Sequence, residues 1–153
     1  MKIYRALVYA LMLLALSAGC ARTGEKKNGD AYRLPEKYNF RFIGRDIEID
    51  NPDKDRRSYY KVIIDKADEG RTTTGLESQE KIYEASLAPN RHLLTVEKWV
   101  LDQKSSRYIK LNNIEQPKPS FIYFDVPENK IVVIEMKTMK DGKALITVDF
   151  ERK

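Results

Sequence analysis

The stretch 131–150, IVVIEMKTMKDGKALITVDF, decides the fold class. Two runs rich in valine, isoleucine and threonine stand on either side of Lys-Asp-Gly-Lys at 140–143. Such branched side chains favour strands because they fit a pleated surface. Asp-Gly between two such runs is typical of a β-hairpin, because the tight primed turn needs positive φ angles that these residues tolerate. The sequence therefore predicts an antiparallel hairpin here.

Comparable runs precede this hairpin at intervals of about ten residues, a spacing typical of small all-β domains. Proline, glycine, asparagine and aspartate separate the runs, and these residues favour turns. We expect a bulge or bend at Gly44 and a shift of register between Val96 and Trp99. The runs cover residues 39–50, 58–65, 88–101, 107–114 and 120–126, with weaker candidates at 72–78 and 81–87.

The pattern totals seven or eight short strands, which predicts an all-β fold: an antiparallel β-sandwich or a small β-barrel. Both architectures share this strand pattern, so the sequence leaves them as alternatives. Residues 77–85 fit a short helical turn as well as a strand. No pattern of a long amphipathic helix competes with the strands.

The first 19 residues have the parts of an export signal. An uncharged run at 6–16 follows two basic residues and precedes three small residues at 17–19. The uncharged stretch is shorter than the roughly 20 apolar residues that a membrane-spanning helix needs. We therefore interpret residues 1–19 as a signal peptide.

The sequence Ser17-Ala18-Gly19-Cys20 resembles the lipobox of bacterial lipoproteins. The resemblance implies cleavage between Gly19 and Cys20, with Cys20 as a lipidated N-terminus. A thiolate is a strong nucleophile and suits thioether formation. Two or more acyl chains hold a protein stably on a bilayer, as the implied three-chain anchor would. The alternative is an ordinary secretory signal, cut after Ser17 or Gly19, with Cys20 as a free thiol.

The residue after Cys20 is Ala21. Aspartate at this position retains enterobacterial lipoproteins at the inner membrane, so the resemblance implies the outer membrane, facing the periplasm or the cell surface. Residues 20–38 are polar and show no apolar period, which predicts a flexible tether after the lipid. The β-domain is expected to cover residues 39–153.

Residues 88–96, APNRHLLTV, are similar to the proline-turn-strand of small PEGA or immunoglobulin-like repeats in envelope lipoproteins. The resemblance implies a β-sandwich and no particular site. With Cys20 assigned to the lipid, the β-domain has no cysteine, so its stability must come from packing.

The charge of the chain argues against nucleic acid as a partner. Without residues 1–19 the formal charge is +3, because that segment carries two of the 28 basic residues and none of the 23 acidic ones. Basic and acidic residues alternate, for example at 53–57, as on a solvated surface rather than a phosphate-binding stripe.

The sequence offers no pattern of catalysis, so we expect neither an enzyme nor a cofactor. One histidine and no free domain cysteine make a zinc site improbable. A calcium site at Asp50, Asp53 and Asp55 is less favoured than a solvated turn, because two arginines follow. His92 has no nucleophile motif to serve and is interpreted as a surface or hydrogen-bonded structural residue. Phosphate-binding glycine loops are lacking as well.

A binding surface is the remaining candidate site. Trp99, Tyr108 and Tyr123 fit an exposed aromatic platform, since such rings dominate interface energetics. The alternative, favoured by burial tendencies, is that Trp99 fills the core. Tyr59 and Tyr60 are adjacent in a strand, so they must face opposite sides of the sheet.

These observations favour a non-catalytic envelope lipoprotein. Its expected partners are the lipid bilayer, through acylated Cys20, and an envelope or extracellular protein bound by the β-domain. An antiparallel edge suits such binding through strand addition. The alternative is a surface-exposed, adhesin-like or glycan-binding lipoprotein that uses its aromatic residues.

Overall fold

The computed structural model describes residues 37–49 and 51–153, and within them the fold is a β-sandwich. The all-β prediction is confirmed, and ten strands are present in this part of the chain. In order, the elements are β1 (Phe40–Asp46), the 3-10 helix η1 (Pro52–Lys54), β2 (Arg57–Ile64), β3 (Ala67–Arg71), β4 (Gly75–Leu76), β5 (Lys81–Ala85), β6 (Arg91–Asp102), β7 (Arg107–Lys110), β8 (Phe121–Asp125), β9 (Lys130–Thr138) and β10 (Ala144–Arg152).

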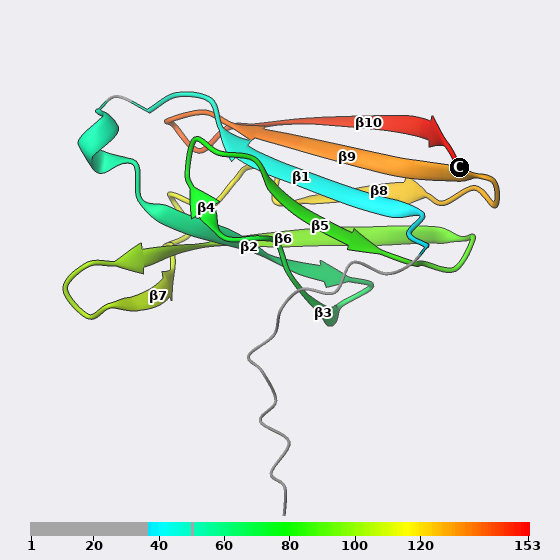
Figure 1. The fold of residues 1–153 in the computed structure, drawn as a ribbon, viewed down its shortest axis with the longest axis horizontal. Coiled ribbons are helices and arrows are strands. Elements are labelled where there is room, and N and C mark those ends of the chain that lie inside the picture. Colours follow the sequence, from blue (N-terminus) through cyan, green and yellow to red (C-terminus); the bar gives the residue numbers. More distant parts are fainter. Residues whose placement is uncertain (1–36, 50) are drawn as a thin grey trace, which may run out of the picture. The chain divides into compact units, whose positions relative to one another are not determined.

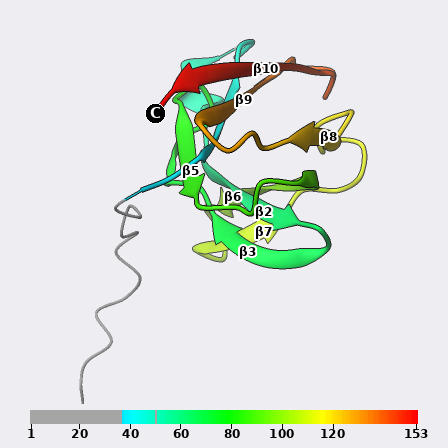
Figure 2. The same cartoon turned by 90° about the vertical axis from the view of Figure 1, so that its right-hand side faces the viewer.

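The strands form two separate sheets, visible as two layers in Figures 1 and 2. One sheet has the order β10-β9-β1-β5. The other has the order β3-β2-β6-β7, with β4 also pairing β2 and β8 also pairing β6. The pairing is antiparallel except between β1 and β9, which run parallel. Both sheets have free edges and do not close into a barrel. The prediction of a β-sandwich is therefore confirmed, and the barrel alternative is wrong.

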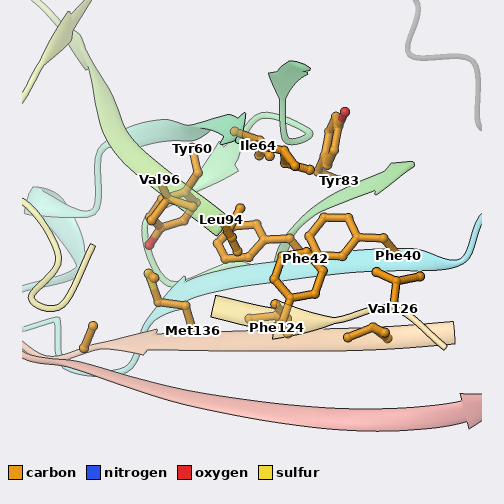
Figure 3. Packing of buried hydrophobic residues seen from close by; sticks show 14 residues of the cluster. Phe40, Phe42, Tyr60, Ile64, Tyr83, Leu94, Val96, Phe124, Val126 and Met136 are labelled. Carbon is orange, nitrogen blue, oxygen red and sulfur yellow. The ribbon is translucent and has the colours of Figure 1, made fainter. Parts of the chain in front are cut away.

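Inward-facing aromatic rings fill the space between the sheets (Figure 3). Phe40 stacks on Phe124 with ring centroids 5.0 Å apart, and Phe42 meets Tyr60 edge-on at 5.7 Å. Leu94 and its alternate neighbours on β6 face the same space. The period of two in the sequence therefore translates directly into one buried face for each sheet.

The expected irregularity at Gly44 is wrong. β1 keeps a continuous register with both neighbours across this residue. A Cβ at position 44 would lie 2.5 Å from Cε2 of the buried Tyr60 ring. Glycine is therefore required here because an aromatic ring packs against the strand backbone, and not because the strand bends.

The long strand β6 also lacks the expected shift of register. Its twelve residues alternate without interruption, with Leu94 and Val96 inside and Trp99 and Leu101 on the opposite side. The helical alternative for residues 77–85 is wrong as well, because Lys81–Ala85 is strand β5 and pairs with β1.

Two turns differ from the expectation. The polar segment after β2 turns at Asp65 and Lys66, whose φ angles of 51° and 69° are those of a primed turn, and then continues as strand β3. The hairpin between β9 and β10 is present, but its loop has three residues, because Met139 N–H donates to the Lys143 carbonyl at 2.8 Å. Only Gly142 in this loop has a positive φ, of 81°. The expected two-residue primed turn is therefore wrong for this hairpin.

A side chain completes the six-stranded sheet where two strands meet the same edge of β6. Strand β8 pairs with residues 91–95 and β7 with residues 99–102, which leaves a gap at Lys98. The carboxamide of Gln116 fills this gap: its oxygen accepts from Lys98 N–H at 2.8 Å, and its nitrogen donates to the carbonyls of Lys98 and Leu111. The carboxamide of Gln116 thus makes the hydrogen bonds that a backbone amide of a neighbouring strand would make.

Candidate functional site

A cluster of aromatic rings lies on the outer face of the six-stranded sheet. Tyr59 of β2 and Trp99 of β6 are directly opposite each other in the ladder. Their rings are nearly parallel, at 8°, with centroids 6.1 Å apart. Tyr108 of β7 meets Tyr59 edge-on at 5.0 Å. We call these three residues the aromatic face.

Strand alternation explains why these rings lie outside the core. Tyr60 is buried, so Tyr59 faces the opposite side, as the sequence predicts. Trp99 lies between the inward-facing residues Lys98 and Val100 and shares the outer face. The expectation that Trp99 fills the core is therefore wrong, although the residue is partly buried.

Cations border the aromatic face. The guanidinium of Arg71, on β3, lies 5.3 Å from the centre of the Tyr59 ring, within the range of a cation–π interaction. Partial burial raises the pKa of the Tyr59 phenol, against the opposing effect of Arg71 and Lys61. The Trp99 indole N–H is covered and has no hydrogen-bond partner among the described residues.

Tyr123 is not part of this cluster. It lies on β8, opposite Leu93 near the start of β6, whereas Trp99 is near the end of that strand. Its side chain is 56% exposed, and the guanidinium of Arg91 lies 5.3 Å from its ring centre. The structure therefore joins Trp99 and Tyr108 in one cluster through Tyr59, whose ring contacts both, and leaves Tyr123 at the other end of the same sheet.

The opposite outer surface, on the four-stranded sheet, has a different chemistry. Ion pairs cross its strands: Arg41 contacts Glu84 at 2.7 Å, and Glu135 lies between Arg45 at 3.6 Å and Lys137 at 2.9 Å. Among the described residues, no outward-facing side chain on the strands of this sheet is aromatic. Tyr38 precedes β1 and is not on a strand. The two outer surfaces therefore differ in their aromatic side chains, while both carry ion pairs between strands.

A second cluster, of charged side chains, is buried at one end of the sandwich. The Lys98 ammonium contacts carboxylates of Asp46 and Glu77, the latter at 2.7 Å. Arg56 holds Glu77 with two hydrogen bonds, at 3.0 and 3.1 Å. A pocket of about 290 Å³ opens beside these residues.

The charges of the buried cluster are paired with one another. Burial alone would raise the pKa of Glu77, but Arg56 and Lys98 outweigh it and hold that pKa below its usual value. The Glu77 carboxylate is thus held as an anion by two cations, and the contacts of Lys98 with Glu77 and Asp46 suit a structural tie between the sheets. Sequence reasoning overlooked this cluster, although Lys98 stands at an inward position of β6 between Val96 and Val100.

Lys81 lies near this cluster and ties down a loop. Its ammonium donates to the backbone carbonyls of Leu76, Glu77 and Gln79 at 2.7–2.9 Å. Burial lowers its pKa to about 8. All three donors of the ammonium are therefore used within the fold.

His92 is a hydrogen-bonded structural residue, as expected. Its ring nitrogens contact the Asp65 carboxylate at 2.7 Å and the Ala88 carbonyl at 2.9 Å. In the acidic loop, Asp55 accepts from Ser78 at 2.6 Å, while Asp50 lies outside the described residues. Within residues 37–49 and 51–153, no three His, Cys, Asp or Glu side chains form a group that could hold a metal ion.

Residues 1–36, which include Gly19 and Cys20, lie outside the described residues. In the part that is described, no helix is long and apolar enough to cross a membrane. No family model, no curated protein and no solved structure matches the chain.

Proposed function

We propose that this protein is a non-catalytic envelope lipoprotein, anchored through Cys20, whose β-sandwich binds another protein through the aromatic face. The observation that carries the binding proposal is the cluster of Tyr59, Trp99 and Tyr108 on a sheet surface outside the core. Aromatic rings are enriched in interface hot spots because they bury a large area at a small entropic cost.

The contrast between the two outer surfaces supports this assignment. Ion pairs link charged side chains on the four-stranded sheet, whereas the other outer surface carries the three rings, bordered by Arg71 and by the ion pairs Lys61–Asp68 and Lys110–Glu97. A relatively flat sheet surface suits a protein partner better than a small substrate, which needs a concave site. The compensated state of the buried charged cluster supports a non-catalytic role.

Site-specific photocrosslinking in intact cells tests the binding proposal. A photoreactive amino acid replaces Leu101, beside the aromatic face, and in a matched control replaces Ile43, on the outer surface of β1. We expect a discrete crosslinked protein from position 101 only, and a several-fold weaker crosslink when Tyr108→Ser is added. Equal crosslinking from both positions, or none from position 101, contradicts the proposal.

Glycan binding is the second candidate, favoured by the near-parallel rings of Tyr59 and Trp99, on which a sugar ring can stack. It predicts that soluble cell-wall oligosaccharides change the fluorescence of Trp99 at saturating concentration. A saturable change that is lost in Tyr59→Ser, with no crosslinked protein at position 101, replaces the protein-binding proposal by this one.

The lipid anchor has a separate test. Cells that express the full chain are labelled with palmitate and fractionated, and wild type is compared with Cys20→Ala. We expect label and membrane association in the wild type, and the loss of both in the variant. Equal partitioning of the two proteins into membranes contradicts lipidation at Cys20.

A further inference from the structure

Strand β10 is the edge of the four-stranded sheet (Figure 1). Half of its backbone groups pair with β9, so the other half point away from the sheet. Lys143, just before the strand, accepts a hydrogen bond from Met139 on the β9 side, whereas the N–H of Ala144 points outward. Alternation along the strand then directs the N–H and C=O groups of Ile146, Val148 and Phe150 outward as well. This row can pair with a further strand.

The chain already begins such a strand. Lys118 forms a parallel bridge with Lys143, donating to the Gly142 carbonyl and accepting from Ala144 N–H, both at 2.8 Å. Among the described residues this pairing covers only the start of the edge. The bridge at Lys118 therefore shows how a further strand can pair with β10. The outward-facing groups from Ile146 onward can extend the same pairing.

The side chains on the inner side of this edge are incompletely covered. Ile146 and Val148 are partly buried and pack against the core, as does Ile122 of β8. Phe150 is 52% exposed and lines a pocket of about 420 Å³ together with Val126 and other residues. Apolar side chains of an added strand would cover this surface.

The outer side of the same edge is acidic in the second half of β10, after Leu145 and Thr147. Asp149 and Glu151 are exposed on β10, two residues apart, and therefore point to the same surface of the sheet. Glu151 has a distant contact with Arg41, at 3.6 Å. A strand that lies beside β10 would place its own outer side chains next to these carboxylates, which favours basic residues there.

A second copy of this chain would meet like charges at two of the possible registers of this edge. Two β10 strands paired about a twofold axis at Asp149 would place the two Asp149 carboxylates opposite each other. An axis at Phe150 would place Asp149 opposite Glu151 twice. Directly opposite like charges destabilise a strand pair. An axis at Val148 avoids these contacts, and only its outermost backbone pair would need Ala144, which is already bonded to Lys118.

We propose that the free edge of β10 binds an extended segment of another protein in which apolar residues alternate with basic ones. The backbone pairs with Ile146, Val148 and Phe150, the apolar side chains cover the inner surface, and the basic side chains lie beside Asp149 and Glu151. This interaction does not depend on the aromatic face, which belongs to the other sheet.

The test uses capped peptides as long as β10 that alternate valine with lysine, or valine with glutamate as the control. Binding to the protein is measured by titration calorimetry, and the bonded amides are identified by hydrogen exchange in NMR spectra. We expect the lysine peptide to bind and to protect the amides of Ile146, Val148 and Phe150. The glutamate peptide should bind at least roughly fivefold more weakly.

Three variants locate the site. Val148→Pro removes an outward N–H without removing a bond to β9, so it should abolish binding. Asp149→Lys should weaken binding of the lysine peptide roughly fivefold, whereas Glu128→Lys, the same change of charge in the turn before β9, should leave it unchanged. Asp149→Lys keeps the test valid if Val148→Pro does not fold.

Other results would overturn the proposal. These are a lack of binding by the lysine peptide, protection of amides elsewhere, or equal affinities of Asp149→Lys and wild type. A concentration-dependent dimer in sedimentation that protects the β10 amides without peptide would assign the edge to a second copy instead. Tyr108→Ser should leave peptide binding intact, so failure of this proposal is distinguishable from failure of the aromatic face as a binding site.

Discussion

Position 44 has room for a hydrogen atom and nothing larger. A Cβ there would lie 2.5 and 2.7 Å from two carbons of the Tyr60 ring, which is itself fully buried. Gly44→Ala should therefore lower the free energy of unfolding by about 1–3 kcal/mol, the usual effect of overpacking a core. Urea denaturation measures the change.

Gly75→Ala provides the control for Gly44→Ala. The closest atom to a Cβ at position 75 is Oε1 of Gln79, at 3.1 Å, which belongs to an exposed side chain that accepts from Leu76 N–H and not to a buried ring. This variant should lose clearly less stability than Gly44→Ala. Equal losses would show that the ring contact with Tyr60 is not the cause.

The only histidine of the chain should make stability depend on pH near neutrality. Burial alone would lower the pKa of His92, but the Ala88 carbonyl and the Asp65 carboxylate outweigh it and raise that pKa above 6.5. A raised pKa in the folded state means that the charged ring stabilises the fold fully below pH 6.5. This contribution is lost as the pH rises through the folded-state value.

The pH dependence is measured as denaturation midpoints from pH 5 to 9 for wild type and His92→Gln. The advantage of the wild type should be largest at the acidic end of this range and shrink as the pH rises. A difference between the two proteins that is independent of pH would show that the contact with Asp65 does not involve a charged ring.

At the scale of elements, Gln116 joins two strands to the edge of β6. Gln116→Leu leaves the Lys98 N–H and the Leu111 carbonyl without their partner in a buried place and removes one of the two donors to the Lys98 carbonyl, which should cost about 2–3 kcal/mol of unfolding free energy. Gln103→Leu, in the exposed turn after β6, should change stability by less than about 0.5 kcal/mol. A loss below about 1 kcal/mol for Gln116→Leu would contradict the role of its amide as a substitute for strand backbone.

The elements themselves were largely predictable, because strands with one buried face have a period of two that the sequence displays. β1 and β8 lie within predicted runs, and β2, β6, β9 and β10 extend only one or two residues beyond theirs. β3 was not predictable as a strand because its residues, ADEGR, are polar on both faces at the edge of a sheet. The choice between sandwich and barrel depends on which distant strands pair, and the parallel pairing of β1 with β9 leaves no local signal.

The candidate site was predictable only in part, because it too depends on which distant strands pair. Trp99 and Tyr108 were recognisable as residue types, but their meeting through Tyr59 depends on the register between β2, β6 and β7. The separation of Tyr123 follows from the place at which β8 joins β6. The buried cluster around Lys98 combines residues from four distant segments, and only the inward position of Lys98 signals it in the sequence.

At the scale of the whole molecule, Lys98 connects the two sheets. It extends from β6 to Asp46 at the end of β1 in the opposite sheet and to Glu77 in the loop between β4 and β5. Lys98→Met would leave two buried carboxylates with one cation fewer and should cost about 3–5 kcal/mol of unfolding free energy. Thermal and urea denaturation measure this loss.

Lys110→Met is the matched control for the Lys98 variant. Lys110 forms an ion pair with Glu97 at 2.5 Å on the surface, where such pairs contribute at most about 1 kcal/mol. If both variants lose the same small amount of stability, Lys98 does not tie the sheets together.

The position of Trp99 also determines what optical measurements on this protein report. It is the only tryptophan in the chain, and it lies on the outer face of one sheet beside Tyr59 rather than between the sheets. Its emission spectrum therefore monitors that outer surface, while the circular dichroism of the backbone monitors the strands as a whole. Denaturation followed by both signals compares a local surface with the entire fold, and coincident curves would establish that the two are lost in a single transition.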